Sequence, residues 1–280
     1  MQVKCFIVRL ILTLILLPPA IRAYSQKTGE EGGIVLHSFM VGAGSANLLD
    51  TYLSPYNYKG TDIRLVRETF RMTSLADSNI AVQTFLNADF AFLRNRAHTA
   101  DEYSGGARYS VNWMYRFKVC PTLMLYAGGG LTGYGGGTWN TRNSNNPGQA
   151  RLELMADATA EAVYNLKIRS KTYQMRYQLA LPMLGAAFSP HYGQSYYEMS
   201  LGHYDHNVCF AYFGNMPSLR QVFSVNIPVA GVNLRLGYVG DISQSKLNGL
   251  RYHNYTHTLM VGVAKYFYRV KKQKTEQLFF

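Results

Sequence analysis

The chain has 280 residues, of which 48% are hydrophobic and only 16% are charged, with 22 Tyr, 14 Phe, 25 Gly and a formal net charge of +12. A soluble domain carries about 25% charged residues, so this balance is unusual for one, and the hydrophobic content excludes intrinsic disorder. After the N-terminal segment no run of about 20 apolar residues occurs, as a spanning helix requires. These features favour an all-β chain.

Residues 1–25 are expected to be a secretory signal peptide. Lys4 and Arg9 precede the apolar stretch 10–17, which is too short to span a bilayer. A retained signal anchor is the alternative. The processed chain stays basic, but an exported chain does not normally meet nucleic acid. The expected counter-charges are therefore anionic lipid headgroups or lipopolysaccharide phosphates.

From residue 33 onward, apolar and polar residues alternate with a period of two over segments of about ten residues. Residues 107–117 and 151–166 show it best, and this is the pattern of a transmembrane strand with one lipid face and one lumen face. A soluble β-sandwich also alternates, but its strands are about half as long. The expected strands are 33–43, 60–73, 80–94, 103–117, 121–134, 151–166, 171–181, 194–202, 207–213, 219–227, 231–243 and 253–267.

These segments predict a closed antiparallel transmembrane β-barrel over residues 26–268, because an open sheet edge cannot lie in lipid. It has about twelve strands, or ten if 194–202 and 207–213 do not form a pair. Both termini, including the basic tail 269–280, are then periplasmic in a Gram-negative outer membrane. The short connections 74–79, 118–120, 167–170, 203–206 and 228–231 fall on the periplasmic side. The longer ones, 44–59, 95–102, 135–150, 182–193 and 244–252, fall outside.

Several segments resemble a family of Bacteroidetes outer-membrane barrels known only as the domain-of-unknown-function 3316 family. The resemblance is carried by Gly42-Ala43-Gly44, Leu49-Asp50-Thr51-Tyr52-Leu53-Ser54-Pro55, Tyr58-Lys59-Gly60, Phe188-Ser189-Pro190-His191-Tyr192-Gly193-Gln194-Ser195-Tyr196-Tyr197-Glu198, Asp205-His206-Asn207, Pro217-Ser218-Leu219-Arg220-Gln221 and Gln244-Ser245-Lys246-Leu247-Asn248. It implies an outer-membrane location and a barrel, and no catalytic or binding residues.

Two groups could supply a Ser/His hydrolase at the lipid boundary. His191 and Ser195 lie near Glu198, and Ser245 lies near His253. A serine needs an adjacent, oriented base to act as a nucleophile. Neither group has the His-x-Ser-Asn-Gly pattern of outer-membrane phospholipase, so we favour polar residues that hydrogen-bond within loops.

Metal, disulfide and phosphate sites are not expected, and no cofactor is implied. His203, Asp205 and His206 suit a solvated turn, since structural zinc takes four N or S ligands. Cys120 and Cys209 are expected near periplasmic strand ends, but on strands too far apart to bridge. The glycine-rich stretch 128–137 suits a barrel rim. It leads into loop 138–150, the candidate surface for an external partner of unknown identity.

The predicted lumen face collects charges of both signs. They either line a narrow pore or pair into a network that closes the lumen. We favour a structural or surface barrel with a charge-networked lumen, with outer-membrane lipid, lipopolysaccharide and the barrel-assembly machinery as partners. The alternatives are a narrow channel for ions or small solutes and a lipid-active hydrolase at the outer leaflet. The lumen residues are Arg64, Glu68, Asp89, Arg108, Arg116, Glu153, Asp157, Glu161, Arg176, Glu198 and Arg235.

Overall fold

The structure is a computed structural model that describes residues 34–229 and 232–268. The expected signal peptide, the tail 269–280 and the turn at 230–231 lie outside these residues. Among the described residues, no helix is long and apolar enough to cross a membrane.

The described chain consists of long strands and one helical turn, α2 (Tyr196–Ser200). The strands are β1 (Ile34–Asp50), β2 (Tyr58–Met72), β3 (Ile80–Asn95), β4 (Asp101–Cys120), β5 (Leu123–Asn140), β6 (Gly148–Ile168), β7 (Lys171–Phe188), β8 (Val208–Tyr212), β9 (Ser218–Val229), β10 (Val232–Leu247) and β11 (Leu250–Tyr268).

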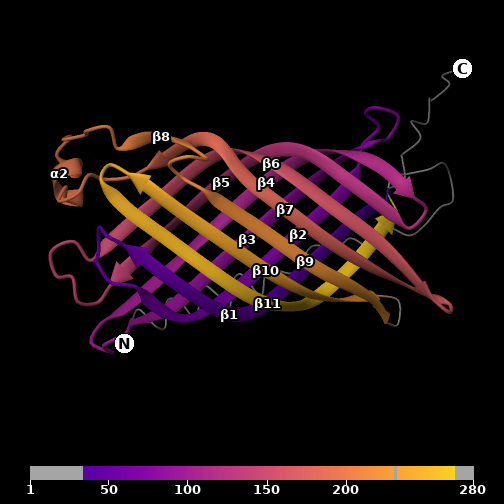
Figure 1. Cartoon of the computed structure of the whole chain (residues 1–280), viewed down its shortest axis with the longest axis horizontal. Helices are drawn as coiled ribbons and strands as arrows, with labels where there is room; N and C mark the ends of the chain where they lie inside the picture. Colours follow the sequence, from indigo (N-terminus) through magenta and orange to yellow (C-terminus); the bar gives the residue numbers. More distant parts are fainter. Residues whose placement is uncertain (1–33, 230–231, 269–280) are drawn as a thin grey trace, which may run out of the picture. The chain divides into compact units, whose positions relative to one another are not determined.

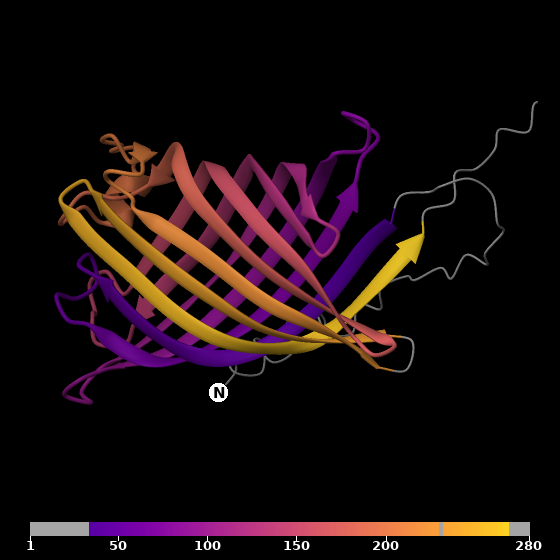
Figure 2. The ribbon, with the colours of Figure 1, turned by 45° about the vertical axis from the view of Figure 1, so that its right-hand side comes forward.

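Ten strands form a closed antiparallel barrel (Figures 1 and 2). Each pairs with its neighbours in the order β1, β2, β3, β4, β5, β6, β7, β9, β10 and β11, and β11 pairs with β1. The prediction of an all-β closed barrel is confirmed. The ring has ten strands rather than twelve, which is the number expected if 194–202 and 207–213 do not form a pair.

The difference in strand number comes from the segment between β7 and β9. Residues 194–202 do not form a strand, because Ser195 and Glu198 form a capping box that begins α2 instead. The extra strand β8 pairs with Leu184–Phe188 of β7, beyond the part of β7 that pairs with β9. Both β8 and β9 run antiparallel to β7, so they share one place in the wall.

The two ends of the barrel differ, and we call them the turn end and the loop end. The turn end holds the tight β4–β5 and β6–β7 connections, the β2–β3 connection, the start of β1 and the end of β11 (Figure 2). The loop end holds α2, β8 and the β1–β2, β3–β4, β5–β6 and β10–β11 connections (Figure 1). Residues 203–206 and Cys209, expected at the periplasmic end with the short turns, lie at the loop end, because α2 replaces a strand.

The strands continue further into the expected loops than their alternation predicts. The β5–β6 loop shrinks from 135–150 to 141–147, and the glycines of 128–137 lie within β5 rather than at its rim. The expected loop 244–252 is a two-residue turn, Asn248-Gly249, with φ of 49° and 77°. Positive φ at both central residues is what a type I′ hairpin turn requires.

Alternation places apolar side chains on the outer face of the barrel and polar ones inside. On β4, Tyr109, Trp113 and Phe117 are exposed, whereas Ser110 and Asn112 are buried. Following the paired residues from Leu179 of β7 once round the barrel leads from Ala160 to Gly148 on β6, a stagger of 160 − 148 = 12 residues. An eight-stranded barrel is just filled by side chains, so this slightly wider ring needs long ones to close it.

Candidate functional site: the lumen of the barrel

Ten of the eleven residues expected in the lumen lie on the inward face. Six are buried and four are half-buried. The buried ones are Arg64, Glu68, Asp157, Glu161, Arg176 and Arg235, and the half-buried ones are Asp89, Arg108, Arg116 and Glu153. The exception is Glu198.

Glu68 of β2 is the centre of a network toward the turn end. Its carboxylate accepts hydrogen bonds from Arg176 of β7 at 2.7 Å, Arg235 of β10 at 2.6 Å and Gln83 of β3 at 2.8 Å. Arg176 also donates to Glu161 at 2.6 Å. β2 and β7 are five places apart in the ring of ten, so the Glu68–Arg176 pair crosses the full width of the lumen. We call this pair the inner strut.

Two further groups fill the lumen at neighbouring positions. Gln83 and Gln178 of β7 bond directly to each other at 2.6 Å. Arg220 of β9 reaches across to Ser110 of β4 at 3.1 Å. An apolar cluster from six strands lies among these polar groups, made of Met40, Val66, Phe85, Val222, Val239 and Met260. Side chains therefore occupy the lumen rather than only lining it.

The middle of the lumen holds a second ionic group around Arg64. Its guanidinium pairs with Asp62 on its own strand and with Asp241 of β10, and it donates to Thr256 of β11 at 2.8 Å. Asp89 accepts from Asn87 at 3.2 Å. Arg64 thus ties three strands together at one depth.

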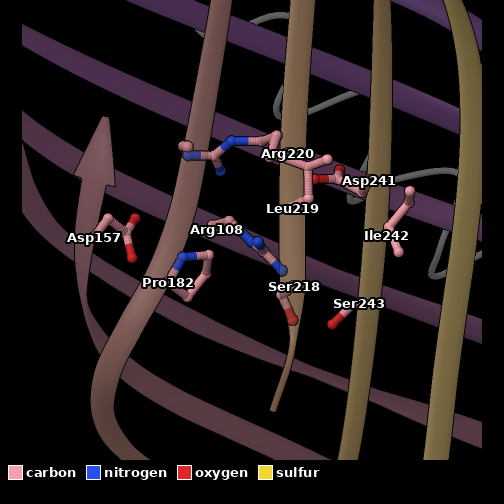
Figure 3. A pocket seen from close by; sticks show the side chains of 10 residues that line it. Arg108, Asp157, Pro182, Ser218, Leu219, Arg220, Asp241, Ile242 and Ser243 are labelled. Carbon is pink, nitrogen blue, oxygen red and sulfur yellow. The ribbon is translucent and has the colours of Figure 1, made fainter. Parts of the chain in front are cut away.

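Two cavities lie beside this group, with volumes of about 10 and 20 Å³. Each has room for about one water molecule. Arg108 and Asp241 line both. Figure 3 shows the smaller one, which Asp157 and Arg220 also line. Space of this size does not admit a solute.

Toward the loop end, Arg151 of β6 crosses the lumen to Asp50 of β1 at 2.6 Å. These strands are also five places apart in the ring. The Arg151 guanidinium lies 3.2 Å from the centre of the Tyr252 ring, which holds it by a cation–π contact. We call the Asp50–Arg151 pair the outer strut.

The β1–β2 loop covers the mouth above the outer strut. Its Leu53 is buried, and its carbonyl accepts a hydrogen bond from Asn143 of the β5–β6 loop at 3.1 Å. Just below, Asn140 donates to Glu102 at 2.8 Å and to Tyr58 at 3.0 Å. The loop end is thus closed by contacts between opposite sides of the barrel.

Glu198, expected in the lumen, is exposed on α2 outside it. Its carboxylate accepts from the backbone N–H of Ser195 at 2.7 Å, and the hydrogen bonds from Ser195 lower the pKa of Glu198. Nearby, Tyr52 of the β1–β2 loop donates to the Gln194 carbonyl at 2.8 Å. Burial raises the pKa of Tyr52 to about 12, so its hydroxyl stays protonated as the donor.

The two Ser/His groups are not arranged as catalytic pairs. Ser195 Oγ is engaged by Glu198 at 3.0 Å, whereas His191 Nε2 lies 3.6 Å from Asp205. Ser245 pairs across the hairpin with buried Tyr252, and His253 pairs with Gln244. Successive residues of a strand point to opposite faces, so Ser245 and His253 lie on opposite faces of the wall.

Within the described ranges no group of three or more His, Cys, Asp or Glu side chains could hold a metal ion. Asp205 contacts His206 at 2.7 Å and His191 at 3.6 Å, and all three side chains are at least partly exposed. Cys120 and Cys209 are free.

Three residues that close the lumen were not among the expected ones: Asp50, Arg151 and Arg220. Two of them, Arg151 and Arg220, have a signal in the sequence. Arg151 precedes Glu153 on the same face of β6, and Arg220 alternates with Ser224 on β9. Asp50 comes at the end of β1, beyond the end of the expected strand, so its face could not be assigned.

Residues 8–274 match a protein family described as "Protein of unknown function (DUF3316)". The chain belongs to this family. No curated protein sequence matches the chain significantly.

Several solved structures are similar in architecture. The outer membrane protease OmpT from Escherichia coli is 9% identical with a TM-score of 0.48, over 87% of this chain and 100% of that one. The transport unit of the autotransporter AIDA-I from Escherichia coli is 8% identical with a TM-score of 0.45, over 93% and 97%. The translocator domain of autotransporter NalP from Neisseria meningitidis is 10% identical with a TM-score of 0.40, over 96% and 100%.

Proposed function

We propose that this family member is an outer-membrane scaffold whose barrel is closed by its own side chains and displays the α2 loop at the cell surface. One observation carries the proposal. The inner strut, Glu68–Arg176, and the outer strut, Asp50–Arg151, join opposite strands at two depths of the lumen. A barrel blocked twice does not conduct solutes.

The outward face supports a membrane location. Large apolar side chains stay exposed around the barrel, including Phe39, Leu86, Trp113, Leu236 and Val261. A contiguous apolar surface of this kind is unsuited to water, and a closed barrel leaves no strand edge in lipid. Outer-membrane lipid and lipopolysaccharide are the proposed surroundings, reached after export by the signal peptide and insertion by the barrel-assembly machinery.

The contrast between the two ends supports an orientation with the turn end in the periplasm, because outer-membrane barrels have short periplasmic turns and longer external loops. Cys120 at the turn end and a Tyr197→Cys variant at the loop end, in a chain with Cys209→Ser, test it. A membrane-impermeant maleimide should label the Tyr197→Cys thiol on intact cells, and Cys120 only after the membrane is permeabilised. The reverse order would mean the opposite orientation.

Planar bilayer recording tests the closed lumen. The purified full chain should insert without stepwise conductance, because both struts span the pore. Insertion is verified separately by flotation of the protein with liposomes, so that a silent bilayer is not mistaken for a failure to insert.

The channel alternative makes the opposite prediction. A narrow pore lined by Arg108, Arg116 and Glu161 would show conductance that changes in Arg108→Ala, Arg116→Ala or Glu161→Ala variants. Such steps in the unaltered protein would contradict the scaffold proposal.

A further inference from the structure

Three cations lie on the outer wall of the barrel rather than in its lumen. Arg67 and Arg71 of β2 and Lys265 of β11 are exposed, and they alternate with buried or inward residues of the same strands. Between them, His37 of β1 pairs across the sheet with Thr69 on one side and Lys265 on the other. We call these five residues the basic wall patch.

The patch lies where the apolar outer face approaches the turn end, since Arg71 is the second-last residue of β2. Arg67 is flanked across the sheet by Phe39 on β1 and Leu86 on β3, which are 49% and 41% exposed. No carboxylate of the described residues lies within salt-bridge distance of Arg67, Arg71 or Lys265, whereas Arg64, Arg151, Arg176 and Arg235 in the lumen all have one. A lipid-facing cation is unfavourable in a depth-dependent way, so these three need an anion from outside the wall.

The aromatic and polar members of the patch are held in place. Thr69 Oγ1 lies 3.2 Å from His37 Nδ1, and the Phe267 ring contacts His37 edge-on at 5.3 Å between centroids. The Lys265 amine lies 5.3 Å from the centre of the same Phe267 ring. Two guanidinium groups and one ammonium group therefore share the outer face with a His37 ring that is held in place. Guanidinium matches the geometry of phosphate oxygens.

We propose that the basic wall patch binds the phosphate of a membrane phospholipid headgroup. The patch lies toward the turn end, on the strands where the chain starts and finishes the barrel (Figure 2), so the lipid belongs to the leaflet on that side. This inference rests on the proposed membrane-spanning scaffold and adds a defined lipid site to it. An acyl chain of this lipid would then lie along Phe39 and the apolar outer face that continues toward the loop end.

Native mass spectrometry of the detergent-solubilised full chain tests the site. Phosphatidylglycerol should remain bound at a concentration at least about tenfold lower than phosphatidylcholine, whose choline offsets the phosphate charge. The Arg67→Gln/Arg71→Gln/Lys265→Gln variant should lose this preference. The matched control is Lys118→Gln/Lys167→Gln/Lys171→Gln, which removes the same charge from exposed positions at the same end and should keep it.

The other outcomes overturn the proposal. They are equal retention of the two lipids, equal loss in the control variant, or complete displacement of phosphatidylglycerol by millimolar inorganic phosphate, which would indicate a free-phosphate site. If the triple variant does not fold, the single Arg67→Gln and Arg71→Gln variants carry the same comparison. The liposome flotation and bilayer recordings are independent of this site, so a failure of the lipid site leaves the scaffold proposal to be judged by them.

Discussion

Glu68 is the residue on which most of the lumen pairing depends. Two guanidinium groups, those of Arg176 and Arg235, share its carboxylate. Replacing Glu68 with Gln leaves Arg235 with no carboxylate partner and Arg176 with Glu161 alone. Breaking a buried ion pair costs about 3–5 kcal/mol. We expect Glu68→Gln to lower the free energy of unfolding by that amount, measured by guanidinium titration in detergent with tryptophan fluorescence.

The exposed Glu198→Gln variant is the control for that measurement, since it removes the same charge outside the lumen. Adding Arg235→Met to Glu68→Gln should restore part of the loss, because Arg176 keeps Glu161 as its partner and neither of these two buried charges is left unpaired. An unchanged midpoint in Glu68→Gln would mean that water replaces the carboxylate freely, and the lumen would not be closed there.

Position 106 requires glycine because the Tyr134 ring lies over it. A Cβ added there would come within 2.7 Å of ring atoms of Tyr134, whereas one added at Gly133 would meet nothing within 4 Å. We expect Gly106→Ala to destabilise the barrel by about 1–3 kcal/mol through overpacking, and Gly133→Ala to have little effect. The same unfolding titration compares them, and Tyr134→Ser combined with Gly106→Ala should recover the loss.

At the scale of elements, β8 is an edge strand, and one side chain forms hydrogen bonds with backbone groups on its unpaired side. Asn215 accepts from the Tyr212 N–H at 2.8 Å and donates to the Phe210 carbonyl at 2.9 Å. An exposed strand edge invites pairing with other chains, and this amide occupies it. Asn215 therefore acts as a substitute for a neighbouring strand.

Removing that amide should loosen β8 alone. Each hydrogen bond contributes about 0.5–1.5 kcal/mol, so Asn215→Ala should speed hydrogen exchange of the Tyr212 amide about tenfold and leave β9 and β10 unchanged. The exposed loop residue Asn145→Ala serves as the control. Equal exchange in both variants would show that water or the adjacent chain protects the edge equally well.

At the scale of the whole molecule, the two struts are closures in series. Opening one leaves the other in place, so Asp50→Asn/Arg151→Met or Glu68→Gln/Arg176→Met alone should give silent bilayers. The combined variant should show conductance steps, provided that flotation confirms insertion. Conductance in either double variant alone would mean that a single strut closes the lumen.

The faces of the strands could be predicted from alternation, because one face must be apolar and the other polar along each strand. That is why the inward positions of Arg64, Glu68 and Arg235 follow from the sequence. Which strands face each other could not be predicted in this way. Which strands lie opposite each other depends on the number of strands in the ring and on its stagger. The two struts, which join β1 to β6 and β2 to β7, therefore depend on both.

The choice between twelve and ten strands depends on one local competition. Residues 194–202 alternate well enough for a strand, but Ser195 and Glu198 stand at capping-box spacing, and their reciprocal hydrogen bonds form a helical turn. The Asn248-Gly249 pair is likewise a hairpin signal, which shortens the expected loop 244–252 to a turn. Both signals are local, whereas the expected boundaries came from hydrophobic period alone.

The pairing of β1 with β11 has a consequence for how the molecule folds. It joins residues 34–50 to residues 252–268, and contacts between segments so distant in sequence slow folding. Arg235, on the strand before β11, reaches Glu68 only when the ring closes. Closure of the wall and neutralisation of this buried carboxylate are then one cooperative event. A chain that stops before β10 lacks both, and it should stay unfolded rather than form a smaller barrel.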